Sequence, residues 1–211
     1  MMAGQRIAII GAGWAGLQNA ATFKQLLQFD NLWDQSKIDI YDAHDGVGGT
    51  WHHDLAYHNL RIHSPVYTAE FEDYPFPDES KLSKRISAEE MQKYIQGFAR
   101  GKGLMPMLRL SRLVQEVLYD EESHTSYLKV CQVKDVKSAV HLIATDSPDD
   151  NVEVVGPYDL VVYASLAGVP NIPSGMPGFE SFQGIHLHSS QVKTELFHQI
   201  IRENKRVAIV G

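Results

Sequence analysis

The chain has 211 residues, of which 44% are hydrophobic and 21% are charged, and its formal net charge is −7. This composition is typical of a soluble globular protein with one large domain or one and a half, and the absence of any basic run in the sequence excludes the usual surface of a nucleic-acid-binding protein. The single cysteine, Cys131, excludes an internal disulfide, favours a reducing compartment and is expected to be a half-buried structural thiol.

The first predicted element is a buried strand over residues 7–10, which runs into a glycine-rich loop and a helix over residues 17–29. Gly11 permits a tight turn, Gly13 lets the backbone approach a pyrophosphate, and Gly16 lets the helix pack closely on the strand. Because the first N–H groups of a helix lack backbone partners, they can face the phosphates of a dinucleotide. We therefore expect a dinucleotide site rather than an ordinary strand–turn–helix, formed by Gly11, Ala12, Gly13, Trp14, Ala15 and Gly16.

The uncharged run over residues 7–23 is short for a membrane-spanning helix. Its glycines have the spacing of a phosphate loop, and no substantial charged segment precedes it as in a signal peptide. We therefore expect no membrane span and a cytoplasmic location.

A second short strand is predicted over residues 38–41, after a polar, turn-rich stretch over residues 28–37. Asp42 follows this strand directly. In a βαβ unit an acidic residue at this position accepts hydrogen bonds from ribose hydroxyl groups and repels a 2′-phosphate. The alternative is a helix-capping or surface aspartate.

The segment AHDGVGGTW, residues 43–51, contains a second group of glycines. These glycines allow a tight turn that exposes the backbone. The side chains after the turn are a hydroxyl group and a broad ring, placed where the isoalloxazine of a flavin could lie. The residues concerned are Gly49, Thr50 and Trp51.

Together these motifs resemble the N-terminal part of the class B flavoprotein monooxygenases, which include flavin-containing monooxygenases, Baeyer-Villiger monooxygenases and N-hydroxylases. Residues 59–77 are similar to the family's stretch ending in D-[FY]-P-[FM]-P, and residues 164–173 to its A-[TS]-G-x-x-x-x-P-x-[IL]-P signature. Phe182, Gly184 and His188 match the first part of F-x-G-x-x-x-H-x-x-x-[WF]. The resemblance covers essentially the whole chain.

Three positions depart from the family's pattern. His63 stands where many relatives have an asparagine near the flavin, Leu166 replaces the glycine of the second signature, and Val192 replaces the last aromatic residue of the third. A histidine at position 63 can donate a hydrogen bond, but its charge changes near neutral pH. Leu166 adds bulk where close backbone approach is normal.

The resemblance implies an FAD- and NADPH-dependent monooxygenase that inserts one oxygen atom from O2 into a small organic substrate. It implies FAD contacts at the first glycine loop and at Asp42, and it names no residue for proton transfer. The remaining FAD contacts that it implies are Gly49, Thr50, Trp51, His63 and Val114.

Two other kinds of site are considered and set aside. Several histidines cluster in the sequence, but none has the spacing of a known metal motif, so no metal is expected. Ser64 lacks a G-x-S-x-G elbow, which argues against a catalytic triad. The histidines are His44, His52, His53, His58 and His63.

Ser87 and Glu90 fit a capping box that opens an amphipathic helix ending near Gly101. The stretch after it predicts an antiparallel meander that covers the parallel sheet, with the last strand returning to that sheet. These strands are expected over residues 113–119, 127–133, 139–144, 152–155 and 160–163. A solvent-facing turn is expected at residues 147–151 and a helix over residues 194–204.

The last predicted strand, RVAIVG at residues 206–211, echoes RIAIIG at residues 6–11. In the resembled family this is where a second dinucleotide fold, which binds NADPH, begins. The expected fold is therefore α/β: a Rossmann-like three-layer FAD-binding domain with an antiparallel β-meander, truncated at the start of a second Rossmann domain. We assign residues 1–204 to the FAD-binding domain, incomplete without a returning C-terminal segment, and residues 205–211 to the first strand of the NADPH-binding domain.

The leading hypothesis is that the chain is the FAD-binding part of such a monooxygenase and is not self-sufficient. A truncated, non-catalytic remnant that at most binds FAD is one alternative. A working half that needs a separate chain with the NADPH domain is another, and a simple FAD- or NAD-dependent oxidoreductase is a third.

Overall fold

The structure is a computed structural model that describes residues 4–57, 59–77, 84–134, 152–165, 177–188, 192 and 194–209. The strand expected over residues 139–144, the turn at 147–151 and Leu166 lie outside the described residues. The described helices and strands are α1 (Trp14–Phe29), α2 (Ala88–Gly101), α4 (Thr194–Arg202), β1 (Arg6–Ile10), β2 (Lys37–Tyr41), β3 (Leu108–Arg109), β4 (Arg112–Asp120), β5 (Thr125–Gln132), β6 (Val152–Tyr158) and β7 (Leu160–Tyr163).

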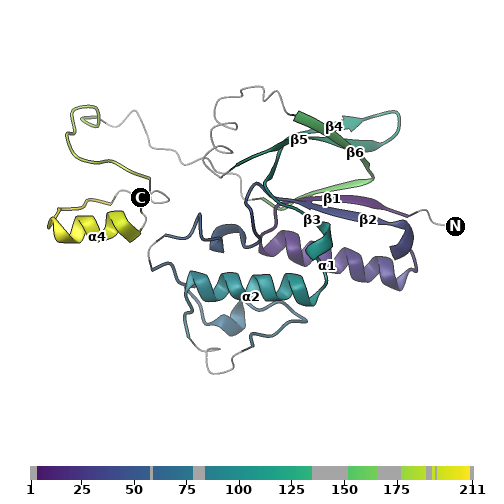
Figure 1. Cartoon of the computed structure of the whole chain (residues 1–211), viewed down its shortest axis with the longest axis horizontal. Coiled ribbons are helices and arrows are strands. Elements are labelled where there is room, and N and C mark those ends of the chain that lie inside the picture. Colours follow the sequence, from purple (N-terminus) through teal and green to yellow (C-terminus); the bar gives the residue numbers. More distant parts are fainter. Residues whose placement is uncertain are drawn as a thin grey trace.

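Four parallel strands form the central sheet, in the order β3-β2-β1-β7. β1 pairs along its whole length with β2, from Arg6 opposite Lys37 to Ile10 opposite Tyr41. α1 connects β1 to β2, α2 lies between β2 and β3, and both helices lie on the same face of the sheet (Figure 1). This arrangement is that of a Rossmann dinucleotide-binding unit.

The central strands are buried on both faces, as expected for a parallel sheet. On the helix-covered face, alternate residues belong to the main core: Ile7, Ile9, Ile38 and Ile40. On the other face, the residues between them pack on the antiparallel sheet: Ala8, Ile10 and Tyr41. Helices, parallel sheet and antiparallel sheet thus form the three layers that the sequence predicted.

The antiparallel sheet contains β4, β5 and β6 in that order, and β7 returns from it to the parallel sheet. Its core residues against the parallel sheet are Leu128, Val130 and Tyr158. Cys131 is fully buried beside Leu113 and Val133, so it is a structural thiol more deeply placed than the sequence predicted.

A charged residue lies unexpectedly between the two sheets. Asp39, in the middle of β2, has a fully buried side chain whose Oδ2 accepts a hydrogen bond from the hydroxyl of Tyr158 at 3.0 Å. The guanidinium of Arg109 lies 2.7 Å from Oδ1, and Lys37 Nζ lies 2.8 Å from Oδ2. Buried carboxylates need such partners, so this network joins the two sheets by polar contacts as well as apolar ones.

The capping box at the start of α2 is present. The Ser87 hydroxyl accepts the Glu90 N–H at 3.3 Å, and the Glu90 carboxylate accepts the Ser87 N–H at 2.9 Å. These bonds satisfy two donors at the helix start. The helix then buries one face in the main core, with Met91, Tyr94, Ile95 and Phe98.

The expected C-terminal helix is present as α4, but residues 205–209 form no strand in the described part of the chain. Val207 and Ile209 are 62% and 89% exposed. A strand requires a hydrogen-bonded neighbour, and none of the described strands pairs with this segment. Among the described helices, none is both long enough and apolar enough to cross a bilayer.

Candidate functional site

The first glycine loop connects β1 to α1 by a backbone path that side chains would block. Gly11 donates its N–H to the carbonyl of Tyr41 at 2.7 Å and has a φ of +112°, which favours glycine. A Cβ on Gly11 would lie 2.7 Å from the carbonyl oxygen of Ala164, and one on Gly16 would lie 1.8 Å from that of Gly11. Both positions therefore require glycine for close packing.

The N-terminus of α1 opens from this loop. Gly13 is the N-cap residue, and no side chain of the described residues forms a capping hydrogen bond there. The first turn contains no acidic residue, and Leu17 is the residue whose N–H bonds the Gly13 carbonyl at 3.0 Å. The amides of the first turn can therefore bind an anion, as at other helix N-termini.

Asp42 forms the edge of this loop. Its Oδ2 accepts the Ala12 N–H at 2.6 Å, and its Oδ1 accepts the His44 N–H at 2.8 Å. His44 Nδ1 also lies 2.7 Å from Oδ1. Asp42 therefore first serves as an intramolecular clamp that holds the glycine loop to the end of β2, a role that the sequence analysis did not assign to it.

The pKa values of this pair shift in opposite directions. Burial alone would raise the pKa of Asp42, but the His44 side chain and the Ala12 and His44 amides stabilise the carboxylate, so its pKa lies below the ordinary value. Burial would lower the pKa of His44, but the hydrogen bond and the negative charge of Asp42 raise it above the ordinary value. Each member of the pair thus stabilises the charged form of the other at the mouth of the loop.

The second glycine loop lies directly against the first. Gly48 donates its N–H to the Ala12 carbonyl at 3.1 Å. Gly49 has a φ of +56°, and a Cβ there would lie 2.9 Å from the Cα of Gly13. The short 3-10 turn Gly49–Trp51 follows, with the side chain of Thr50 exposed and that of Trp51 half-buried against the main core.

Trp14 occupies a different place from the rest of its loop. Its ring stacks on that of Phe71, with centroids 3.9 Å apart and planes inclined by 11°, and Phe71 stacks in turn on Phe98 of α2. The side chain therefore anchors the start of α1 to the helix layer, whereas its backbone N–H belongs to the first turn. Tyr94 lies beside this stack, and its hydroxyl oxygen accepts a hydrogen bond from the Phe71 N–H at 2.8 Å.

Two of the predicted contacts, His63 and Val114, make no described contact with the glycine loops. His63 is exposed, and no described contact links it to either loop. Val114 packs in the apolar layer between the two sheets. Only the start of its strand approaches the loops, since Arg112 donates its N–H to the Asp42 carbonyl at 2.9 Å.

Histidines gather beside the second loop. The rings of His44 and His53 lie 4.8 and 4.2 Å from that of His52, which is buried. Burial and the nearby charges of His44 and His53 lower the pKa of His52. Nε2 of His44 is buried and has no hydrogen-bond partner among the described residues.

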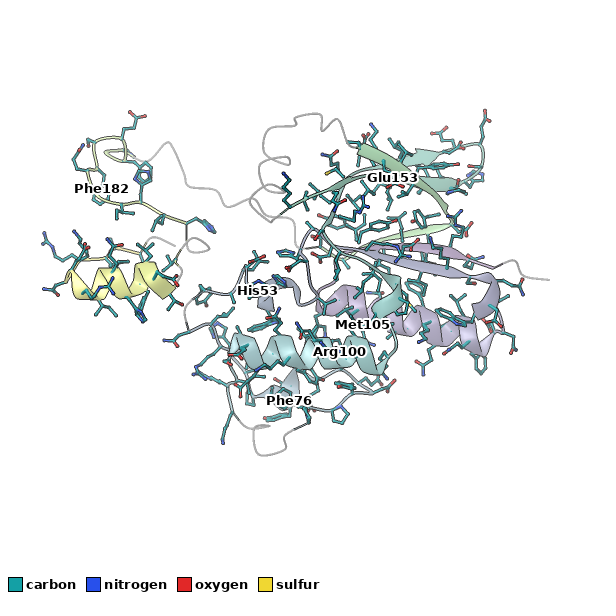
Figure 2. All side chains as sticks on the ribbon, viewed as in Figure 1. His53, Phe76, Arg100, Met105, Glu153 and Phe182 are labelled. Atoms are coloured by element: carbon teal, nitrogen blue, oxygen red, sulfur yellow. The ribbon has the colours of Figure 1, made fainter. Side chains whose placement is uncertain are left out.

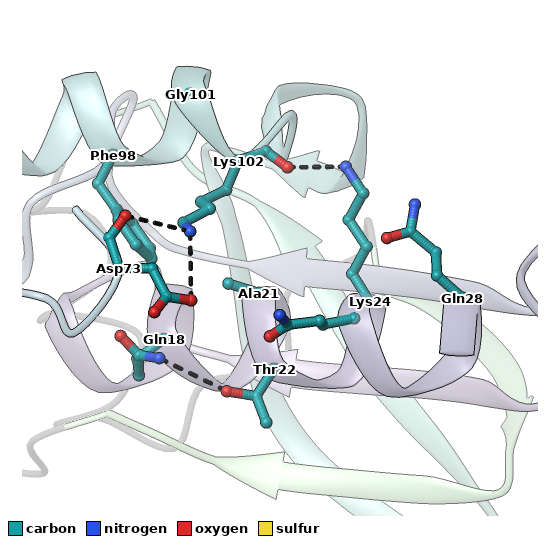
Figure 3. A pocket seen from close by; sticks show the side chains of 10 residues that line it. Gln18, Ala21, Thr22, Lys24, Gln28, Asp73, Phe98, Gly101 and Lys102 are labelled. Carbon is teal, nitrogen blue, oxygen red and sulfur yellow. Dashed lines mark hydrogen bonds and ion pairs between the residues drawn. The ribbon is translucent and has the colours of Figure 1, made fainter. Parts of the chain in front are cut away.

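Two hollows lie near these elements. The one between α1 and α2, about 260 Å³, is crossed by polar contacts: Lys24 Nζ donates to the Lys102 carbonyl at 2.7 Å, and Lys102 pairs with Asp73 at 3.6 Å (Figure 3). None of its lining residues belongs to a glycine loop. The other hollow, about 480 Å³, is lined by His53, Tyr57 and Glu195 of α4 among others.

The chain belongs to the flavin-binding monooxygenase-like family, whose model matches residues 4–211. An FAD-dependent monooxygenase of Pyrenophora dematioidea is 25% identical over 187 residues, which cover 88% of this chain and 31% of that protein. Senecionine N-oxygenase of Tyria jacobaeae is 29% identical over 223 residues, which cover 98% of this chain and 41% of that protein.

Solved structures show the same fold. S-allyl-L-cysteine S-oxygenase from Allium sativum superposes with a TM-score of 0.67 at 19% identity, covering 90% of this chain and 43% of that one. Cyclohexanone monooxygenase from Rhodococcus sp. Phi1 bound to NADP+ superposes with a TM-score of 0.58 at 20% identity, and the match covers 90% of this chain and 31% of that one. The chain thus spans less than half the length of these relatives.

Proposed function

We propose that this chain is the FAD-binding part of an NADPH-dependent flavin monooxygenase that inserts one oxygen atom from O2 into a small organic substrate. The observation that carries the proposal is the contact between the two glycine loops at the N-terminus of α1. Family membership supplies the flavin chemistry, and the loops supply a place for the cofactor's phosphates.

The residues present fit a dinucleotide. A Cβ on Gly13 would lie 3.3 Å from the Cα of Gly49, so both backbones line one cradle without side chains. The amides of the first turn of α1 would bind the pyrophosphate. With no side chain at Gly13, the phosphates can approach the backbone closely.

Asp42 and His44 would hold the ribose next to the pyrophosphate. Asp42 accepts three donors within the chain, and a carboxylate has about four lone-pair sites, so one site remains for a ribose hydroxyl. The buried Nε2 of His44 offers a second polar partner. A carboxylate at this place repels a 2′-phosphate but accepts a hydrogen bond from a free 2′-hydroxyl, which is the group that the ribose of FAD carries.

Thr50 and Trp51, directly after the second loop, would flank the flavin ring, and His63 and Val114 would add further contacts to FAD. When bound, FAD supplies the redox chemistry of oxygen transfer, and the protein binds, orients and shields it. We assign no residue of this chain to proton transfer.

The relatives bear on the reaction class. The relatives named for N- and S-oxygenation suggest a heteroatom-containing substrate, and the cyclohexanone monooxygenase suggests a ketone as the second candidate. One relative was solved with NADP+ bound, which supports NADPH as the reductant. Because the chain spans 31–43% of these relatives, we assign NADPH binding to residues outside these 211 or to a separate chain.

The test is reconstitution of the purified chain with FAD. We expect stoichiometric flavin absorbance after desalting and a higher melting temperature with excess FAD. Gly13→Ala should weaken FAD binding at least about tenfold because its Cβ enters the cradle, and Thr22→Ala, on the exposed face of α1, should bind like the wild type. No flavin absorbance and no gain in melting temperature would refute the proposal.

NADPH oxidation separates the remaining alternatives. With FAD bound, the chain alone should not sustain NADPH oxidation if the reductant site lies elsewhere. Restoration of turnover by a separate polypeptide that carries an NADPH domain would favour the two-part enzyme. Turnover by the chain alone would contradict our assignment of NADPH and exclude the non-catalytic remnant.

A further inference from the structure

One cluster of side chains beside the second glycine loop has no role in the proposed FAD site. It consists of two carboxylates and two imidazoles, which offer one oxygen or nitrogen atom each within 4.8 Å of one another. Its members come from the two ends of one loop: Asp45, His52, His53 and Asp54.

The buried imidazole fixes the position of the cluster. The side chain of His52 is 1% exposed, with Nε2 3.1 Å from Asp45 Oδ1 and Nδ1 3.6 Å from Asp54 Oδ2. A Cβ on Gly46 would lie 3.2 Å from His52 Nε2, so a side chain at position 46 would crowd this edge of the ring. One donor is therefore held in place before any ion arrives.

The other donors can move toward it. His53 Nε2 lies 3.3 Å from Asp54 Oδ1, and the side chains of His53 and Asp45 are 65% and 73% exposed. Figure 2 shows His53 at the side of the sheet-and-helix body that is turned toward α4, and the same residue lines the hollow of about 480 Å³. Of the four side chains, His53 is the one that lines this hollow, so an ion in the hollow would meet its imidazole first.

We propose that Asp45, His52, His53 and Asp54 form a binding site for a Zn²⁺-class divalent ion. Two imidazole nitrogens and two carboxylate oxygens are a ligand set that suits zinc, whereas magnesium and calcium prefer oxygen ligands alone. Tetrahedral zinc with bonds of about 2.0–2.2 Å holds its ligands about 3.3–3.6 Å apart. Two pairs already lie near this spacing, at 3.1 Å for His52 Nε2 and Asp45 Oδ1 and at 3.3 Å for His53 Nε2 and Asp54 Oδ1. The ligand atoms of all four residues lie within 4.8 Å of one another, so the exposed side chains must move closer to His52 to complete the tetrahedron.

Metal binding would tie together the two ends of the second glycine loop. Asp45 precedes residues 46–51, and His52 follows them. Closing this loop reduces the conformational freedom of Gly48, Gly49 and Thr50. This consequence rests on the proposed function: an ordered loop should bind FAD more tightly, whereas metal binding itself does not depend on FAD.

The experiment titrates the full chain with ZnCl2 alone, without FAD, in competition with a chromophoric chelator. We expect one equivalent to bind and the melting temperature to rise. His53→Ala and Asp45→Ala should each weaken zinc binding at least about tenfold without lowering the melting temperature of the metal-free chain, because both side chains are exposed. His124→Ala removes an exposed histidine on the β4–β5 turn and should bind zinc like the wild type.

Failure of zinc to saturate, or equal affinity in His53→Ala, Asp45→Ala and His124→Ala, would overturn the proposal. A second titration measures FAD affinity with and without one equivalent of zinc. Zinc binding in a chain that does not bind FAD would retain the metal site and refute the proposed function. FAD binding in a chain that does not bind zinc would retain the proposed function and refute the metal site.

Discussion

Gly13 and Gly49 meet backbone to backbone, because a Cβ on Gly49 would lie only 2.9 Å from the Cα of Gly13. The two residues belong to different glycine loops, one between β1 and α1 and the other after β2. Glycine at both positions allows these loops to form a continuous cradle at the helix N-terminus. This contact joins two separate sequence motifs into one candidate cofactor site.

The first prediction concerns the asymmetry of this contact. Gly49→Ala introduces a Cβ at a φ of +56° and at 2.9 Å from a backbone atom, so we expect a loss of about 1–3 kcal/mol in the free energy of unfolding. Gly13 has a φ of −83°, which alanine adopts readily, and a Cβ there would lie 3.3 Å from the Cα of Gly49. Gly13→Ala should therefore remain near wild-type stability. Urea unfolding of both variants provides the comparison.

Both variants should also lose FAD affinity, which a flavin fluorescence titration measures. If Gly49→Ala is as stable as the wild type, the close contact between the loops is not present in solution. If Gly13→Ala is the less stable of the two, the assignment of strain to Gly49 is wrong.

Local patterns in the sequence account for the elements that carry this cradle. The apolar run before Gly11 predicts β1, and Ser87 with Glu90 predicts the start of α2, because each signal depends on neighbouring residues only. The contact between Gly13 and Gly49 is different. It depends on the packing of distant segments, so the sequence indicates two glycine-rich turns but not their meeting.

The second prediction concerns Asp42. Asp42→Asn keeps the size of the side chain but replaces one acceptor oxygen by an NH2 group, which leaves Ala12 or His44 without its partner. We expect a loss of about 1–3 kcal/mol in the free energy of unfolding at pH 7 and weaker FAD binding. Asp34→Asn, at an exposed position, is the matched control and should change little.

The loss should depend on pH. The pKa of Asp42 in the folded chain lies below its unfolded value, which is about 3.9. Its stabilisation is therefore fully present above about pH 5 and is lost as the pH falls through 4 toward the lowered pKa. Urea unfolding from pH 7 to pH 3 should show wild type and Asp42→Asn converging at the acidic end. A constant difference at all pH values would contradict the stabilising role of the ionised Asp42 carboxylate.

The third prediction tests whether Asp42 and His44 act as one unit. His44→Phe keeps a ring next to His52 but removes the Nδ1 donor 2.7 Å from Asp42. In a double-mutant cycle with Asp42→Asn, we expect a coupling of about 0.5–3 kcal/mol in the free energy of unfolding. Additive effects would show that the two side chains are not energetically coupled.

Polar contacts inside apolar patterns are the part of the fold that the sequence does not predict. The strand over residues 38–41 is apolar on the face toward the helices, yet Asp39 lies fully buried on the other face. Its partners Arg109 and Tyr158 come from distant elements and become apparent only once the two sheets are placed. Asp45 and His52 are a second example, because the spacing of the histidines resembles no known metal motif although the turn brings the side chains together.

The fourth prediction concerns Tyr94, whose buried hydroxyl donates to the Tyr74 carbonyl and accepts the Phe71 N–H. Tyr94→Phe leaves both backbone groups without this partner, so we expect a loss of about 1–3 kcal/mol in the free energy of unfolding. Because Phe71 supports the ring of Trp14 at the start of α1, FAD affinity should fall as well. Tyr67→Phe, at a side chain that is 58% exposed, is the control and should behave like the wild type.

The pH dependence of this effect has the opposite sign from that of Asp42. Burial raises the pKa of Tyr94 to about 12, from about 10 in the unfolded chain. The neutral phenol is the stabilised form, so its stabilisation is fully present below pH 10 and is lost as the pH rises through about 12. Urea unfolding between pH 8 and pH 11 should therefore show a smaller alkaline loss of stability in Tyr94→Phe than in the wild type. An identical alkaline loss in both proteins would mean that the Tyr94 hydroxyl is exposed to solvent and does not hold Phe71.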